Sequence, residues 1–181
     1  MNIIPTSIPD VLILEPKVFR DSRGFFMESW NRKVFQKLTG IDKEFVQDNR
    51  SQSAQNVLRG LHYQIKQPQG KLFSVTRGSV FDVAVDLRKS SSTFGKWVGV
   101  ELSDENNRQI WIPEGFAHGF LVLSEHADCF YKTTDYYSPE NERCLKWNDM
   151  DIKINWPING EPLVSTKDQA GLSFGEAEIF P

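Results

Sequence analysis

The sequence predicts an all-β fold, a double-sheet jelly roll with a few short helices, on three observations. About ten short β-type runs are separated by turn residues along the 181-residue chain. The clearest run, residues 80–87, alternates between apolar odd positions and an opposite face that carries Asp82 and Asp86. Hydrophobic residues make up 39% of the chain, which is enough to form a core. A jelly roll hides most strand edges, so it suits this number of strands in one domain.

The predicted strands follow one another closely, with turn residues between them. They cover residues 11–14, 25–28, 45–49, 58–64, 71–76, 80–87, 97–102, 109–112, 119–123 and 128–133. Gly78 lies in a predicted tight turn at residues 77–79, so the strands before and after it are expected to form a hairpin. Further turns are predicted at residues 103–107 and 113–115.

Two short segments have helix signals. Val34, Phe35 and Leu38 share one face at helical spacing, and Asn31 and Gly40 suit the start and the end of that helix. Residues 165–168, with the sequence STKD, resemble a capping box in which the shorter Asp replaces Glu. No linker or internal repeat interrupts the chain, so residues 1–181 are expected to form a single domain.

Composition narrows the classes of function. The net charge of -3 gives no overall positive field that would attract nucleic acid or an anionic membrane. There is no apolar run long enough to span a membrane, and the start of the chain lacks the features of a secretion signal. Cys129 and Cys144 match neither a disulfide framework nor a zinc-ribbon spacing, and inert thiols are expected. These features predict a cytoplasmic protein with reduced cysteines.

The densest polar segment is RGLHYQ at residues 59–64. It places a cation, Arg59, and a titratable base, His62, near the start of one strand. Regular alternation would send the two side chains to opposite faces, but a β-bulge at Gly60 would return them to the same face. The alternative, that His62 only packs and hydrogen-bonds inside the barrel, is equally compatible with this motif.

A second histidine, His118, follows the turn at residues 113–115. His62 and His118 are a conceivable metal pair, because imidazole suits zinc or iron. Metal sites in jelly rolls usually contain a His-x-His pair on one strand, however, and here position 64 is Gln64. We therefore expect no metal.

Several other residues suit a ligand site, each with an ordinary structural alternative. Tyr131 shares one face of its strand with the small residues Cys129 and Thr133, and this face can line a cavity, although a buried tyrosine can also serve packing alone. Tyr137 can stack on a ring or anchor a loop. Arg23, Lys71 and Lys167 suit an anion, although most such side chains are solvated surface charges.

Eight motifs, in order, carry a resemblance to a known family. They are DSRGFFMESW, FVQDN, NVLRGLHYQ, QGKLFSV, GSVFDVAVDLRKSSSTFGKWVGVELS, WIPEGFAHGF, YKTTDYYSP and STKD. With these motifs the chain resembles the dTDP-4-dehydrorhamnose 3,5-epimerases, isomerases of the cupin superfamily, over nearly its whole length. The resemblance implies a cupin-type double-stranded β-helix, no cofactor, and a homodimer in which an N-terminal part of one subunit contributes to its partner's site.

The resemblance also implies roles for individual residues. His62 matches the base, Asp168 its acidic partner, Tyr131 the proton donor and Lys71 the residue that stabilises the enolate. Tyr137 matches the ring that stacks on thymine. The residues implied to contact the diphosphate, sugar or thymidine are Arg23, Glu28, Gln47, Asp48, Asn49, Arg59, Lys71, His118, Glu142 and Lys167.

The implied reaction is epimerisation at C3 and C5 of dTDP-4-dehydro-6-deoxy-D-glucose, which supplies dTDP-L-rhamnose for an O antigen or a cell-wall polysaccharide. A C3-only epimerase and a ketoisomerase on the same fold are alternative enzymes, and a metal-dependent or a non-catalytic sugar-binding cupin is an alternative class. The presence of both His62 and Tyr131 favours epimerisation over isomerisation. It does not separate C3-only from double epimerisation.

Overall fold

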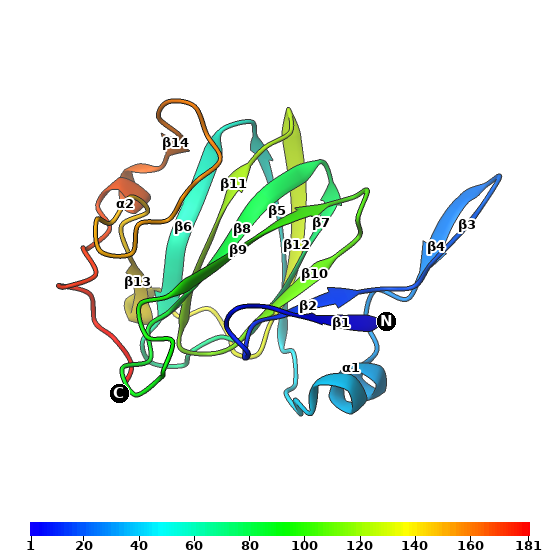
Figure 1. The fold of residues 1–181 in the computed structure, drawn as a ribbon, viewed down its shortest axis with the longest axis horizontal. Helices are drawn as coiled ribbons and strands as arrows, with labels where there is room; N and C mark the ends of the chain where they lie inside the picture. Colours follow the sequence, from blue (N-terminus) through cyan, green and yellow to red (C-terminus); the bar gives the residue numbers. More distant parts are fainter.

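Two β-sheets that face each other form the body of the molecule (Figure 1), and the computed structural model describes residues 1–181. The first sheet has the strand order β1 (Asn2–Pro5), β2 (Leu12–Glu15), β10 (Gln109–Ile112), β7 (Lys71–Arg77), β12 (His126–Thr133) and β5 (Gln47–Ala54). The second has the order β13 (Glu142–Cys144), β6 (Val57–Gln64), β11 (Phe116–Val122), β8 (Ser79–Asp86) and β9 (Trp97–Ser103), with β14 (Leu163–Val164) parallel to β6. This arrangement confirms the predicted all-β jelly roll.

The predicted hairpin across Gly78 is wrong, because its two strands belong to different sheets. β7 pairs with β10 and β12, whereas β8 pairs with β9 and β11. The turn itself exists: Gly78 has a φ of 75°, and a Cβ there would lie 2.1 Å from the carbonyl oxygen of His126. A tight turn of this kind can join two strands of one sheet or connect one sheet to the other. Here it connects β7 of the first sheet to β8 of the second.

The other predicted strands are present, most with ends shifted by a few residues. The structure adds β1, β3 (Val18–Asp21), β13 and β14, which the sequence does not predict. Each of these has four residues or fewer, so no alternation is visible in them.

The helices begin where their capping residues predict. In α1 (Arg32–Thr39) the side chain of Asn31 accepts a hydrogen bond from the Val34 N–H, and Gly40 ends the helix in the left-handed conformation. Phe35 is buried, but Leu38 remains 42% exposed. The other helices are a 3-10 turn at Pro139–Asn141 and α2 (Thr166–Gln169). No helix is both long and apolar enough to cross a membrane.

Three apolar clusters hold the layers together. One fills the space between the sheets around Phe73, Ile110 and Phe120. A second lies on the other face of β6, β8 and β11, where the C-terminal third of the chain covers it. In the third, α1 packs through Phe35 against Trp111, with ring centroids 5.6 Å apart. The second sheet is therefore covered by apolar side chains on both faces. Polar side chains line a separate part of the space between the two sheets.

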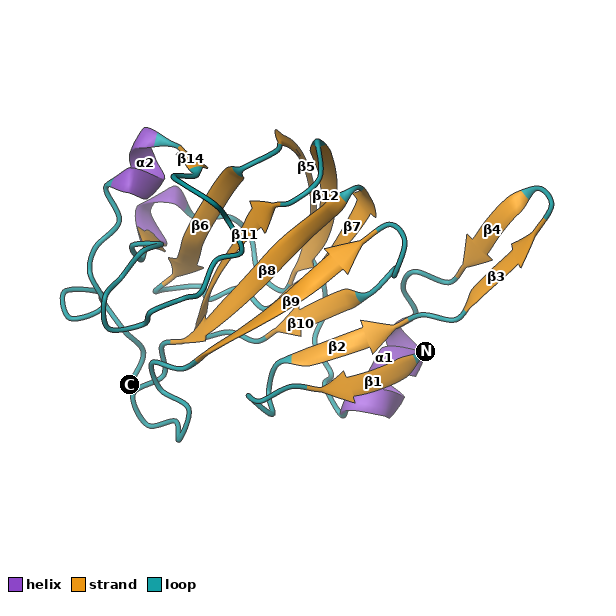
Figure 2. Cartoon of the chain, turned by 45° about the horizontal axis from the view of Figure 1, so that its top comes forward, coloured by secondary structure: helices purple, strands orange, loops and turns teal.

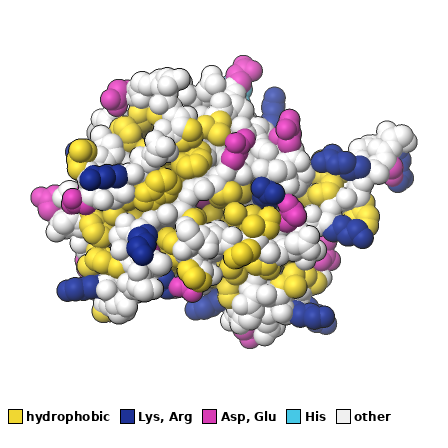
Figure 3. All heavy atoms as spheres, in the orientation of Figure 1, with side chains coloured by type: hydrophobic (Ala, Val, Ile, Leu, Met, Phe, Trp, Pro, Cys, Tyr) yellow, Lys and Arg dark blue, Asp and Glu magenta, His cyan; other side chains and the backbone are white.

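A hairpin of β3 and β4 (Gly24–Met27) projects away from the body of the molecule (Figures 1 and 2). We call it the arm, residues 18–27. Three of its phenylalanines are largely exposed: Phe19 at 53%, Phe25 at 55% and Phe26 at 72%. Basic side chains lie beside apolar ones on the arm (Figure 3), with the central carbon of the Arg20 guanidinium 5.5 Å from the centre of the Phe25 ring. Exposed aromatic area on this scale suits a contact with another chain.

Candidate active site

A pocket of about 390 Å³ opens between the two sheets. It is lined by Gln47, Asn49, Ser51, Arg59, His62, Tyr63, Gln64, Gln69, Lys71, Phe73, His118, Gly119, Phe120, Tyr131, Tyr137 and Glu142. Most of the residues predicted for the site are therefore brought together. Both sheets contribute, so that one wall carries the His62 strand and the opposite wall carries the Tyr131 strand.

The predicted β-bulge at Gly60 is confirmed. The pairing of β6 with β11 shifts register between His118, which lies opposite His62, and Phe120, which lies opposite Arg59. Gly60 has a φ of 122°, and a Cβ there would lie 2.6 Å from the Gly119 Cα. Only a glycine fits this close crossing, and the extra residue turns both Arg59 and His62 into the pocket.

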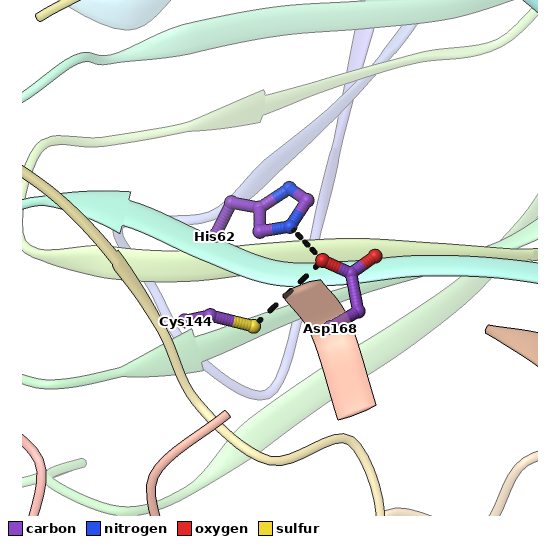
Figure 4. Close-up of side chains that lie close together, drawn as sticks. All are labelled: His62, Cys144 and Asp168. Carbon is purple, nitrogen blue, oxygen red and sulfur yellow. Dashed lines mark hydrogen bonds and ion pairs between the residues drawn. The ribbon is translucent and has the colours of Figure 1, made fainter. Parts of the chain in front are cut away.

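His62 and Asp168 form a hydrogen-bonded pair in which the His62 Nε2 and the Asp168 Oδ1 lie 2.6 Å apart (Figure 4). Burial alone would raise the pKa of the Asp168 carboxyl. The hydrogen bond with His62, the His62 charge and a bond from the Gly60 N–H outweigh burial and lower that pKa below its ordinary value. Asp168 is therefore a carboxylate. When Nε2–H donates to it, Nδ1 remains as the basic nitrogen of the ring.

Only half of the predicted capping box forms. The Ser165 hydroxyl oxygen accepts a hydrogen bond from the Asp168 N–H, which starts α2. The Asp168 carboxylate does not return a bond to Ser165, because it is engaged by His62 and by the Gly60 N–H. The cap thus fixes the backbone of Asp168 while its side chain serves the pocket.

Lys71 lies at the start of β7 and is 92% buried from solvent, with 8% of its surface exposed. Burial lowers the pKa of Lys71 to about 8, although the negative charges of Asp82 and Glu142 oppose this effect. Its ammonium group donates a long hydrogen bond of 3.5 Å to the His62 carbonyl oxygen. At neutral pH the pocket therefore contains a poorly solvated positive charge close to His62, well placed to attract an oxyanion.

A second histidine–aspartate pair lies next to the first and includes a residue that the sequence analysis does not assign to the site. The His118 Nε2 lies 2.8 Å from the Asp82 Oδ2, and Asp82 is fully buried. Its other oxygen, Oδ1, has no hydrogen-bond partner in the chain. The alternation of residues 80–87 already placed Asp82 on the face opposite the apolar one. In the structure this face points into the barrel, because Val80 and Ala84 on the same face belong to the core between the sheets.

Tyr131 comes from β12, across the pocket from His62. Its ring stacks at 5.8 Å on Phe73, which is itself fully buried. Burial raises the pKa of the Tyr131 hydroxyl, and the positive charge of Arg59 offsets part of that rise. The hydroxyl is therefore protonated at neutral pH and can donate a proton from the wall opposite His62.

The rim of the pocket contains a polar network around Glu142. The Tyr137 hydroxyl donates to the Glu142 Oε2 over 2.7 Å, and the Lys167 ammonium pairs with the same oxygen. Burial alone would raise the pKa of Glu142, but the bonds from Lys167 and Tyr137 lower it. The Tyr137 ring remains 51% exposed and borders the pocket, as a stacking residue requires.

Besides Asp168, which reaches this pocket through its bond to His62, four predicted site residues do not line it. Arg23 is at the tip of the arm, where its guanidinium pairs with Asp21. Glu28 follows the arm and accepts a hydrogen bond from Asn31. Asp48 points to the other face of β5 from Gln47 and Asn49, and there it pairs with Lys132.

Lys167, the fourth of them, borders a neighbouring cavity and reaches the pocket only through Glu142. Its role in substrate binding, like those of Arg23, Glu28 and Asp48, stays a prediction.

His62, Cys144 and Asp168 offer ligand atoms within 4.8 Å of one another, the spacing of a possible metal site (Figure 4). The chemistry of these donors does not suit a metal. Burial raises the pKa of the Cys144 thiol to about 12, whereas zinc takes a thiolate. The 2.6 Å between the His62 and Asp168 atoms is also shorter than the roughly 3.3 Å expected between two ligands bound tetrahedrally at about 2.0 Å. The cluster is better described as a hydrogen-bonded pair with a thiol beside it.

Comparison with known proteins identifies the family. A family model described as dTDP-4-dehydrorhamnose 3,5-epimerase matches residues 5–176. The chain belongs to this family. The dTDP-4-dehydrorhamnose 3,5-epimerase of Pseudomonas aeruginosa is 60% identical over 181 residues, which is 100% of both chains.

Solved structures give the same result. A crystal structure of the dTDP-6-deoxy-D-glucose-3,5-epimerase of Legionella pneumophila, in complex with dTDP-4-keto-L-rhamnose, has a TM-score of 0.96 and 54% identity; the match covers 98% of this chain and 94% of that one. A 3'-monoepimerase of Streptomyces bikiniensis in complex with dTDP-quinovose has a TM-score of 0.89 and 33% identity over 97% of this chain and 88% of that one. The predicted family, fold and epimerase function are confirmed.

Proposed function

We propose that this epimerase inverts C3 and C5 of dTDP-4-dehydro-6-deoxy-D-glucose in dTDP-L-rhamnose biosynthesis, with His62 as base and Tyr131 as acid. The observation that carries the assignment is the position of these two groups on opposite walls of one pocket. Inversion needs a proton to leave from one face of a carbon and another to arrive at the opposite face. A base and an acid on facing walls meet this requirement without a conformational change.

The first step is removal of a proton next to the C4 ketone. Such a proton is weakly acidic, so its removal needs a positioned base and stabilisation of the charge that develops on oxygen. Nδ1 of His62 takes the proton, and the Asp168 carboxylate stabilises the imidazolium that results. Lys71, charged below a pH of about 8, stabilises the enolate oxygen.

The second step is reprotonation from the opposite face. Tyr131 donates its hydroxyl proton to the same carbon and becomes a phenolate, whose charge the nearby Arg59 guanidinium offsets. The C4 ketone of the substrate holds the electron pair between the two steps. No redox group takes part in this scheme, and we propose that the enzyme needs neither a metal nor another cofactor.

The second candidate is a C3-only epimerase, favoured by the likeness in fold to the 3'-monoepimerase of Streptomyces bikiniensis. The higher identity to the 3,5-epimerase of Pseudomonas aeruginosa, 60% against 33%, supports double inversion. Analysis of the product from dTDP-4-dehydro-6-deoxy-D-glucose, trapped by a coupled reductase, separates the two. We expect inversion at both carbons and full turnover after exhaustive chelation. A product inverted at C3 alone would favour the second candidate, and loss of turnover on chelation would contradict the cofactor-free scheme.

Tyr137→Ala is expected to weaken the binding of dTDP and to leave the rate of the bound reaction almost unchanged. The ring lies at the rim, and stacking of a base on an aromatic ring contributes about 1–3 kcal/mol, or roughly a 5- to 150-fold change in Kd. Titration of dTDP by calorimetry measures the effect. Tyr136→Ala is the matched control, since this neighbour is 61% exposed and does not line the pocket. An unchanged Kd for Tyr137→Ala would show that the ring does not stack on thymine.

We propose that the protein is a homodimer in which the arm of each subunit reaches the pocket of the other. Three exposed phenylalanines on the arm favour burial against another chain. The arm also carries Arg23, and Glu28 follows it, so both lie outside the pocket of their own chain. Docking of the arm at a second pocket would bring these two predicted contacts to the substrate.

Light scattering should give a mass of about twice the 20.8 kDa of one chain. Phe26→Asp is expected to shift the protein toward the monomer and to lower activity, because it places a charge in the proposed contact. Met150→Asp is the matched control, because Met150 is 78% exposed and lies outside the arm. Phe94→Asp would be unsuitable as a control, because Phe94 packs on Phe174. A fully active wild-type monomer would contradict the arm exchange.

We treat residues 1–181 as one epimerase domain and propose the cytoplasm as its location. Both cysteines are free, and burial raises the pKa of each thiol to about 12, so neither is reactive. Free cysteines suit a reducing compartment. The net charge of -3 gives no reason to expect nucleic acid or a membrane as a partner.

A further inference from the structure

A second cavity, of about 470 Å³, lies behind the catalytic pair on the side of β14 and α2. Its walls include Leu163, Ser165 and Lys167, and it also borders His62 and Asp168. His62 therefore lines two cavities, the substrate pocket and this one. Tyr131 lines only the substrate pocket. Arg59 also lines both cavities, but no proton passes through the second cavity in the mechanism described above.

Double inversion requires His62 and Tyr131 to recover their starting protonation states between the two inversions, whereas a single inversion does not. After the first inversion His62 carries the proton taken from carbon, and Tyr131 has lost the proton it gave. The second inversion can start only when His62 has released one proton and Tyr131 has gained one, which balances with no net uptake. This requirement rests on the proposed function, in which one base and one acid serve both C3 and C5.

The bound sugar limits how His62 can release its proton. The sugar has to lie against the pocket-facing side of the imidazole for the base to reach its C–H bonds, and there it excludes water from that side. The other side of the His62–Asp168 pair borders the second cavity, whose lining residues Leu163, Ser165 and Asp168 do not line the substrate pocket. Tyr131 must regain a proton from solvent in the same interval, and burial favours this uptake because it disfavours the phenolate.

The second cavity has the size and the polarity that a water path needs. A water molecule occupies about 30 Å³ in the liquid, so a space of about 470 Å³ has room for several. The Ser165 hydroxyl, the Lys167 ammonium and the Asp168 carboxylate offer hydrogen-bond partners along it. Leu163 lines the cavity and is 62% exposed, so a larger side chain at this position should narrow its contact with solvent.

We propose that this second cavity is the route by which His62 returns its proton to solvent while the sugar stays bound. The route lets the enzyme complete both inversions in one binding event. Without it, the singly inverted sugar must leave before His62 can be reset. The cavity therefore sets whether the enzyme releases a singly or a doubly inverted product.

Leu163→Trp and Leu163→Phe test the route by narrowing its opening to different extents. The measurement is the initial ratio of singly to doubly inverted sugar released under a large excess of substrate, which keeps a released intermediate from binding again. For Leu163→Trp we expect this ratio to rise about tenfold. The expected effect is smaller than the roughly 10²–10⁴-fold contribution of a positioned proton-transfer group to the rate, because the substitution narrows the route and leaves His62 in place. Leu163→Phe should give a smaller rise, and the rate of the first inversion should change less than about twofold in both variants.

Leu172→Trp is the matched control, because Leu172 is 45% exposed and does not border the cavity. Its product ratio should equal that of the wild type. An unchanged ratio in both Leu163 variants, or an equal slowing of both inversions, would overturn the route. A wild-type enzyme that inverts one centre only would instead contradict the proposed double inversion, so the two failures are distinguishable.

Discussion

His62→Asn is expected to remove both epimerisation and the exchange of the C3 and C5 hydrogens with solvent deuterium. If His62 takes the proton from carbon, no enolate forms without it, and a positioned base is worth roughly 10²–10⁴-fold in rate. Proton NMR of the substrate in deuterium oxide measures exchange and inversion in the same sample. The matched control is His126→Asn, because His126 is half exposed on β12 and does not line the pocket.

A His62→Asn enzyme that exchanges hydrogens at a near-normal rate would place the base elsewhere. His118 would then be the first residue to test, because it lies directly opposite His62 in the strand pairing and has its own carboxylate, Asp82. Asp168→Asn should behave as a weaker form of His62→Asn, since the imidazole keeps its place but loses the carboxylate that orients it.

The longer strands, the helix caps and the jelly roll could be predicted from the sequence, because each leaves a local pattern, whereas the short strands β1, β3, β13 and β14 could not. Alternation marks β8, Asn31 and Gly40 mark the ends of α1, and Gly60 marks the bulge. The pairing of β7 was not predictable in this way. A tight turn at Gly78 is the same local signal whether the next strand joins the same sheet or the opposite one.

In the site, too, contacts between residues close in the sequence are predictable, and contacts between residues far apart in the sequence are not. Arg59 and His62 share a motif, and the bulge between them accounts for their common face. Asp168 lies 106 positions after His62, so without the family resemblance nothing local pairs the two. Alternation places Asp82 on the face opposite the apolar one, but it does not tell which of the two faces points into the barrel, so Asp82 is not predicted as part of the site.

Arg23 and Glu28 illustrate a further limit. The resemblance assigns both to the substrate, yet the single chain places them on and beside the arm, away from its own pocket. A contact that depends on a second copy leaves no local pattern in the sequence beyond exposed apolar residues such as Phe26. In the proposed dimer, docking of the arm at the pocket of a second chain would unite these residues with the substrate.

Tyr131→Phe is expected to separate hydrogen exchange from inversion, which no base variant can do. His62 can still form the enolate and return a solvent-derived proton to the same face, so exchange at C3 and C5 should persist. Inversion needs a donor on the opposite wall, and it should fall by roughly 10²–10⁴-fold. The fold should tolerate the change, because the Tyr131 ring packs on Phe73 and the substitution keeps the ring.

The same deuterium experiment decides the role of Tyr131, with Tyr136→Phe as the matched control. Tyr136 is 61% exposed outside the pocket, so its hydroxyl should matter to neither exchange nor inversion. Equal loss of exchange and inversion in Tyr131→Phe would make Tyr131 part of enolate formation rather than the acid. Unchanged inversion would mean that water, or a residue from the partner's arm, delivers the proton. Persistent exchange with failed inversion is the result that the two facing walls predict, since each wall then performs one half of the reaction.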